Sequence, residues 1–575
     1  MFSIDINVIF NLRDMLLAFL YPRLTQLHFK INIGIRMKKV LKGIVFVIVL
    51  FFVISKGLEW WLESSFESKI NKNPERSYDI TYEDFDLDNF FTGVTLTEMK
   101  IEPLNAKAGS VVTGRVDHAT LNGLVWIDLL VGRRLNMQEI AFVKPVFKVE
   151  IGKDSTKNKG GKGLQTMFGD ILSRADLKSF SLEKGSVMFL NSETQDTIGQ
   201  VKNIDILATE LETDALQFNH LIPFKMGDIN VDIRDGSFQL NDYTFMNLGH
   251  FHYNLKNKEI LLKEVALGYN KSWVEVSREI GFQNDVIEFD VKEIGIHQLE
   301  PSSEFYTQLD IDAGSVSIDG LNIKLQRNKN LQRPADTTKP MFQGMINAIP
   351  VDLKLDSLSI SNSTLAYGEL GLKKLKTGYI TIGDINGSVT GITNKEDHQA
   401  VVGSLHANIK ATLENKAGLN LVMDAPYSNE TFQVDLDVDD MKFTDFNSTL
   451  KPLVGVEMLS GYIQKIKYHM EANSVYSNNH LVFDYKDLNL EVLKEEDTNE
   501  PKRRVFQSAI ANAAIHPSNM PGDKKYSTAA YSYQRNIYRS PINYIIHGLI
   551  EGFTYIVPKK GIQNLLHKKK KPKKN

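Results

Sequence analysis

Two groups of residues have types and spacings that resemble a chemical site. His250 and His252 flank Phe251 in a predicted strand, so both project to one face and could share a zinc ion, but no third ligand of suitable spacing accompanies them. The second group is a set of four aspartates, Asp435, Asp437, Asp439 and Asp440. A calcium loop needs glycine-bearing turns and converging oxygens, whereas these aspartates fill the polar positions of an alternating strand, which indicates a solvated face.

Motifs that carry catalysis are absent from the sequence. It contains no Gly-rich phosphate loop, no Gly-x-Ser-x-Gly elbow and no His-Glu-x-x-His helix. It also contains no cysteine, which excludes disulfides, Cys-ligated zinc, thiol nucleophiles and a lipid-modified N-terminal cysteine. We therefore expect a protein that is not an enzyme and that holds no cofactor or metal.

The elements that must position these residues are strands. Apolar residues alternate with polar ones at Phe432, Val434, Leu436 and Val438, and again at Ile229, Val231 and Ile233. Such alternation gives a strand one apolar and one polar face, which suits antiparallel sheets better than parallel sheets buried on both faces. The predicted fold is mainly β: an N-terminal transmembrane helix, an elongated, curled antiparallel sheet array, few short helices and a C-terminal amphipathic helix.

A short sequence motif, Gly or Asn followed by Ser, recurs between apolar runs. Because Gly and Asn tolerate positive φ, we interpret its copies as hairpin turns, at residues 183–187, 235–238, 312–316, 361–365 and 385–389. Short helices are expected at 164–175 and 342–349, after polar linkers at 157–162 and 332–339.

The ends of the chain are basic and the body is acidic. Residues 43–558 carry 52 basic and 68 acidic residues, a net charge of −16, which argues against nucleic acid as a partner. Residues 43–55 are an uncharged apolar run preceded by lysines and followed by acids and a Trp pair. This pattern predicts an uncleaved signal anchor with a cytoplasmic N-terminus, a cleaved signal peptide being the alternative. The anchor candidates are Gly43, Phe46, Leu50, Phe52, Trp60 and Trp61.

The C-terminal region combines an apolar helical pattern with lysines. The apolar residues at helical spacing are Ile542, Ile545, Ile546, Leu549, Phe553 and Ile556, and the opposite side carries Asn543, His547 and Glu551. Eight lysines without any acid follow Val557. Three interpretations stay open: a helix that caps the sheet, a helix that lies in a membrane interface, and a second membrane span, which Glu551 disfavours.

Few helices are available to cover the many apolar strand faces. Either two sheets face each other in a closed sandwich, or one curled sheet forms a lipid-lined groove, and the pattern is the same in both cases.

The order of several motifs resembles the AsmA-like family of bacterial envelope proteins, which is related to TamB and to bridge-like lipid-transfer proteins. The resembling parts are the N-terminal anchor, the segment 121–151 with its Leu-Leu-x-Gly-Arg turn before Pro145, and the segment 441–492. The resemblance implies an inner-membrane anchor, a periplasmic β-groove, and a role in phospholipid transport or envelope lipid homeostasis. Its implied partners are phospholipids, the inner membrane and other envelope proteins. Groove candidates are Phe147, Phe189, Phe432, Val434, Leu436 and Tyr468.

Other classes of function remain as alternatives: an envelope scaffold, or an assembly factor for outer-membrane proteins that pairs its sheet edge with client strands. The predicted organisation is a mis-assigned extension at 1–36, an anchor at 37–61, β modules at 62–156, 157–340 and 341–498, a loop-rich linker at 499–540, an amphipathic helix at 541–558, and a polybasic tail at 559–575.

Overall fold

The computed structural model describes residues 76–88, 92–104, 110–125, 135–152, 175–211, 227–300, 310–372, 376–493 and 501–568, together with Met167, Asp170 and scattered positions between 42 and 72. The chain divides into two compact units, residues 1–68 and 69–575. In the first unit the described positions between 42 and 66 are helical, whereas Gly43 and residues 1–36 lie outside the described part. None of the described helices is both long and apolar enough to cross a bilayer.

The second unit is built on one sheet in which 22 of the described strands take part. The strands of its N-terminal part are β1 (Tyr78–Thr81), β2 (Asp84–Leu87), β3 (Gly93–Pro103), β4 (Ser110–Asn122), β6 (Glu139–Val143), β7 (Val146–Ile151), β9 (Ser179–Asn191) and β10 (Thr197–Thr209). Those of the middle are β11 (Asp228–Gln239), β12 (Thr244–Asn254), β13 (Glu259–Tyr269), β14 (Asp285–Leu299), β15 (Asp310–Asn328), β16 (Asp352–Leu370) and β17 (Thr377–Thr393). Those of the C-terminal part are β18 (Ser404–Leu413), β19 (Ala417–Pro426), β20 (Phe432–Val438), β21 (Met441–Lys442), β22 (Val456–Ala472), β23 (Tyr476–Val492) and β24 (Ala529–Gln534).

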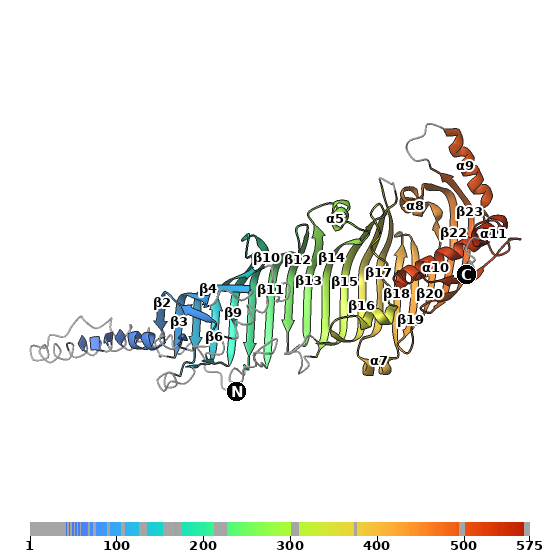
Figure 1. Cartoon of the computed structure of the whole chain (residues 1–575). Coiled ribbons are helices and arrows are strands. Elements are labelled where there is room, and N and C mark those ends of the chain that lie inside the picture. Colours follow the sequence, from blue (N-terminus) through green and yellow to red (C-terminus); the bar gives the residue numbers. More distant parts are fainter. Residues whose placement is uncertain are drawn as a thin grey trace, which may run out of the picture. The chain divides into compact units, whose positions relative to one another are not determined.

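Successive strands lie next to each other along the sheet, as Figure 1 shows for the series from β9 to β20. Most neighbours are antiparallel, but β9 is parallel to β6 and β7, and β16 is parallel to β15. The prediction of a purely antiparallel sheet is therefore wrong at two junctions. A long connection precedes the parallel strand in both cases. It lets the chain cross back along the full strand length, so that the next strand starts beside the first residue of the preceding one. The predicted module boundaries at 156/157 and 340/341 fall in these connections, and the sheet continues through both.

Helices are few among the described residues. Besides the helical positions in partly described segments, they are α5 (Trp273–Ile280), α6 (Phe342–Asn347), α7 (Glu396–Val402), the 3-10 turn η2 (Phe443–Phe446), α8 (Asn447–Val454), α9 (Pro501–Ala514), α10 (Pro541–Ile556) and α11 (Lys560–Lys568). Strands β5 (Leu135–Asn136) and β8 (Ala175–Asp176) form a separate small sheet. The expected helix at 342–349 is confirmed by α6, whereas most of 164–175 lies outside the described residues.

The recurring Gly/Asn-Ser motifs are not hairpin turns, contrary to the interpretation of the sequence. They lie inside β9, β11, β15, β16 and β17, several with a residue in the left-handed region, such as Lys184 (φ 53°), Asp235 (φ 57°) and Asn362 (φ 49°). The register shifts beside Lys184 and Asn362. Residues with positive φ therefore occur here at irregularities within long strands. Such irregularities bend the strand and locally increase its twist.

Candidate functional site: a continuous apolar face

One row of directly opposed residues runs across the sheet without a polar interruption. Each member is the register partner of the next, from β2 to β22. We call it row A, and it consists of Phe85, Leu96, Ala119, Phe142, Leu182, Ile206, Val231, Tyr253, Ile260, Ile296, Val316, Leu358, Val389, Ala407, Met423, Val434 and Met470. At about 4.8 Å between strands, this row extends about 75 Å along the sheet.

A parallel row lies two residues away from row A along most of the strands, and therefore on the same face. This row B consists of Ile204, Ile233, Phe251, Leu262, Ile294, Ile318, Ile360, Gly387, Ile409, Leu421, Leu436, Tyr468, Leu481 and Ala529. The row between them projects to the other face and is mostly polar, with Asp232, His252, Ser317, Ser359, Ser388, Asn408, Asp435 and His469 among its members.

Burial along row A divides the apolar face into three parts. At the start of the row, Leu96 and Phe142 are buried, and at its end Met423, Val434 and Met470 are buried as well. Between them, all eight members from Ile206 on β10 to Val389 on β17 are only half-buried. We call the apolar face of β10–β17 the open stretch and the apolar face of β18–β24 the closed end. The open stretch spans about 34 Å.

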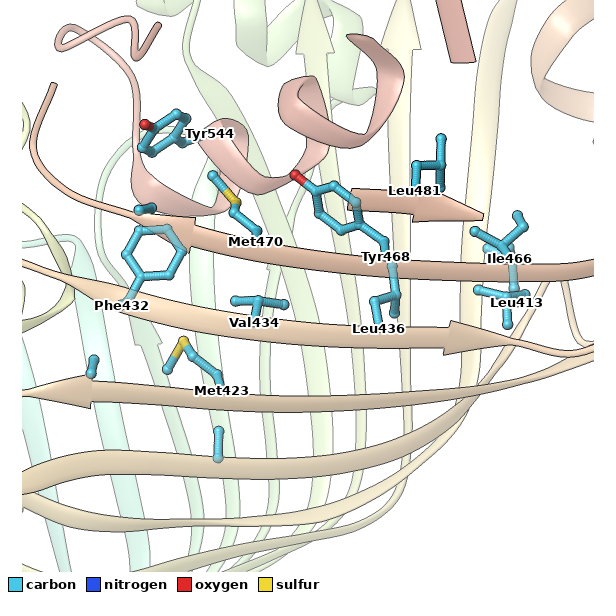
Figure 2. Close-up of a cluster of buried hydrophobic side chains, with 14 of the residues drawn as sticks. Leu413, Met423, Phe432, Val434, Leu436, Ile466, Tyr468, Met470, Leu481 and Tyr544 are labelled. Carbon is cyan, nitrogen blue, oxygen red and sulfur yellow. The ribbon is translucent and has the colours of Figure 1, made fainter. Parts of the chain in front are cut away.

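The closed end is covered by α10 and α6. The Phe432 ring meets Tyr544 of α10 and Phe342 of α6 edge-on, with centroids 6.1 and 5.2 Å apart. Figure 2 shows Tyr544 on the helix above Phe432, with the Tyr468 side chain directed towards the same helix. The Tyr468 hydroxyl donates to Asn479 Oδ1 (2.7 Å) and the Tyr531 hydroxyl to the carbonyl of Gly548 (2.7 Å). Burial raises the pKa of the Tyr468 hydroxyl, so this group stays a neutral donor.

Helix α10 confirms the predicted C-terminal amphipathic helix, but its buried side is rotated from the predicted apolar side. Ile556 is buried and the Phe553 ring lies 4.7 Å from that of Phe483. Glu551, predicted on the side opposite the apolar residues, is only 8% exposed, whereas Ile546 and Ile550 are each 49% exposed. The reason lies in the inner side of the helix: a Cβ at Gly548 or Gly552 would collide with the hydroxyl of Tyr468 or Tyr531, so only glycines permit this approach. The inner side therefore combines glycines and Glu551 with Tyr544 and Ile556, while Ile546 and Ile550 remain outside.

The six groove candidates lie on the apolar face, but five of them are covered. Phe147, Phe432, Val434, Leu436 and Tyr468 are buried, the last four under the closed end. Phe189 alone is half-buried; it pairs with Gly199 and its ring lies 6.1 Å from that of Phe238. Lipid contact at the five buried positions stays a prediction that requires their cover to move. The sequence reasoning did not single out open-stretch residues such as Tyr253 and Ile296, although the same alternation marks them.

Charged pairs flank the apolar face at both ends of its strands. On the row A side, Lys258 Nζ lies 2.7 Å from Glu300 and Lys354 Nζ 3.0 Å from Asp312. A third apolar row, row C, lies on the opposite side and consists of Phe189, Gly199, Phe238, Met246, Leu267, Phe289, Ile323 and Leu365. Beyond row C, Arg327 binds Asp285 at 2.5 Å and Lys329 lies 3.2 Å from Glu369. The open stretch is thus an apolar band between two charged rims.

The residues that first suggested chemistry pair with each other on the polar face. His250 Nε2 lies 2.7 Å and His252 Nδ1 3.6 Å from Asp232 Oδ2. Of the aspartate run, Asp435 accepts from His469 (2.7 Å) and Asp437 pairs with Lys467 (3.3 Å). Within the part of the chain that the structure describes, no group of three or more acidic or histidine side chains could hold a metal ion.

Comparison with models of known protein families and with curated protein sequences finds no match for this chain.

Proposed function

We propose that the open stretch binds the acyl chains of phospholipids, and that the protein transports or stores lipid in a bacterial envelope while anchored in the inner membrane through residues 37–61. The observation that carries the proposal is row A itself: the same uninterrupted apolar row is buried at both ends and half-exposed across eight central strands. The resemblance to AsmA-like proteins stays a prediction beside this argument.

Energetics favour an apolar occupant of this surface. Covering the remaining area of a half-buried aliphatic side chain contributes about 1 kcal/mol, and row A alone holds seven such side chains in addition to Tyr253. Exposed apolar surface of this extent marks a binding region in most soluble domains. Acyl chains would lie along the rows while headgroups stay at the charged rims, where Lys258, Lys354 and Lys329 are placed.

No catalytic step is needed in this proposal, because lipid would slide along a surface whose rows are equivalent from strand to strand. The open stretch, at about 34 Å, is close to the roughly 30 Å thickness of a bilayer core. It is therefore too short to join two separate membranes by itself, and partners or further copies of the chain would have to extend it.

The test compares two neighbouring substitutions in β15. Val316→Asp places a carboxylate in row A, and Ser317→Asp places the same group on the polar face of the same strand. The full-length chain and both variants are purified alike, and bound phospholipids are counted by native mass spectrometry and lipid extraction. We expect Val316→Asp to lose lipid and Ser317→Asp to retain it; lipid around the N-terminal segment is common to all three.

Equal lipid content in all three proteins, with circular dichroism showing that each is folded, would contradict the proposal. A lipid-free wild-type chain would also contradict it and would redirect attention to the scaffold or assembly alternative.

A further inference from the structure

Helix α11 packs against the protein with its polar side. Gln563 Nε2 donates to the carbonyl oxygens of Tyr555 (2.8 Å) and Pro558 (2.7 Å). The His567 ring stacks on Tyr555 with centroids 3.9 Å apart and planes 14° from parallel, and its Nδ1 lies 3.8 Å from Glu551. Gln563 and His567, one turn apart, thus both contact Tyr555 of α10.

The apolar side of α11 faces away from the protein. Leu565 is 61% exposed, Leu566 42% and Ile562 37%. A helix on the surface of a soluble protein normally buries its apolar stripe and solvates its polar one, so α11 is inverted. Helix α10 beside it buries Tyr544 and Ile556 but also leaves aliphatic side chains, Ile546 and Ile550, on its outer side.

The charge around this inverted helix has one sign. Lys559 and Lys560 stand at its start, the sequence continues from its last residue with lysines 568, 569, 570, 571, 573 and 574, and no acidic residue occurs after Glu551. Apolar side chains on one side of a short helix, flanked by lysines, are the combination that binds the interface of an anionic bilayer, where acyl chains meet negatively charged headgroups. The acid that argued against membrane contact at this end is on the buried side.

We propose that α11, with Lys559 and Lys560 at its start, is a docking surface for an anionic lipid membrane, and that the basic sequence after it adds to the attraction. The surface is separate from the open stretch and does not depend on it. If both proposals hold, the closed end of the sheet lies against a membrane surface.

The absence of cysteine makes a site-specific test possible on the full-length chain. Leu565→Cys carries an environment-sensitive fluorophore on α11, and Asn257→Cys carries it at an exposed turn between β12 and β13 as the matched control. Each labelled protein is mixed with vesicles of phosphatidylethanolamine and phosphatidylglycerol, or of phosphatidylcholine alone. A third protein combines Leu565→Cys with Gln in place of the eight lysines.

We expect the label at position 565 to brighten and shift to shorter wavelength with the anionic vesicles only, and the label at 257 to stay unchanged. Replacing the lysines should weaken the response at least about a hundredfold in lipid concentration. The proposal is overturned if position 565 does not respond to anionic vesicles, if position 257 responds equally, or if the lysine replacement has no effect. Lipid content of the Val316→Asp variant is measured independently, so failure of either proposal is visible by itself.

Discussion

The open stretch and the closed end are two parts of one apolar face with different surroundings. Row A passes from Val389, half-buried on β17, to Ala407, buried on β18, without a change in chemical character. The difference comes from the helices, because α10 packs against β22–β24, α6 packs against β17 and β19, and both contact Phe432 on β20. Strand sequence therefore determines which face is apolar, and a helix distant in the sequence determines whether that face is closed.

The largest expected difference between the two parts is the cost of a buried charge. Val434→Asp, at a fully buried position, should lower the free energy of unfolding by about 4 kcal/mol or more, because the carboxylate has no water and no partner. Ile296→Asp, in the same row but half-buried, should cost about 1–2 kcal/mol. Urea titrations followed by circular dichroism measure both. Equal costs would mean that the open stretch is as closed as the C-terminal end.

The second prediction opens the closed end. Gly552→Leu would push a side chain into Tyr531 and Leu481, and overpacking of this kind costs about 1–3 kcal/mol. Hydrogen exchange should accelerate in 541–556 and the number of bound lipids should rise, because Phe432 and Tyr468 become accessible. Gly561→Leu is the control, since a Cβ at Gly561 meets open space. Unchanged exchange in α10 would show that its glycines do not set the approach.

A smaller effect is expected from the polar contacts beneath α10. Tyr468→Phe removes the donor to Asn479 Oδ1, leaving a buried amide short of one partner, at a cost of about 1–2 kcal/mol. Tyr476→Phe, at a half-exposed tyrosine of the adjacent strand β23, should change stability by less than about 0.5 kcal/mol. Thermal melts distinguish the two, and equal shifts would argue against a role of the buried hydrogen bond.

The smallest expected effect is a difference in how stability depends on pH, which arises from charged pairs on the polar faces of the two parts. At the closed end, the hydrogen bond with Asp435 raises the pKa of His469, so this stabilisation is present at acidic pH and is lost as pH rises through the raised pKa. On the polar face behind the open stretch, burial opposes ionisation of Asp232, but hydrogen bonds from His250 and Arg234 lower its pKa overall, so its stabilisation is lost as pH falls through that lowered pKa. Both pairs are partly solvated, so each contributes less than about 1 kcal/mol.

Replacing one member of each pair checks the assignment. His469→Gln should flatten the stability curve on its alkaline side, and Asp232→Asn should flatten it on its acidic side. A curve that is unchanged in both variants would show that these pairs contribute nothing measurable.

Much of the sheet could be predicted from period-two alternation, because side chains of neighbouring positions point to opposite faces whatever the tertiary context. The connection that makes β15 and β16 parallel was visible as a linker and a helix between residues 332 and 349. Its consequence for strand direction was not recognised. The prediction of hairpin turns from the Gly/Asn-Ser motifs was wrong, because a residue in the left-handed region occurs at strand irregularities as well as in hairpins.

The candidate site was harder to predict, since exposure depends on contacts that no local pattern contains. Val434 and Val316 belong to the same row and have similar flanking residues, yet only Val434 lies under a helix that begins more than a hundred residues later. The orientation of α10 was also hidden, because Gly548 and Gly552 acquire meaning only opposite Tyr468 and Tyr531. A helix with glycines and one acid on the same side could have indicated that this side is the buried one.

The most direct test of the account is photo-crosslinking of lipid in living cells at three positions. Tyr253→p-benzoylphenylalanine places the probe in the open stretch, Tyr468→p-benzoylphenylalanine places it at the closed end, and His252→p-benzoylphenylalanine places it on the polar face beside Tyr253. We predict phospholipid adducts at position 253 and none at 468 or 252. Adducts at none of the three positions, or equally at 253 and 252, would contradict the claim that the open stretch is a lipid-binding surface.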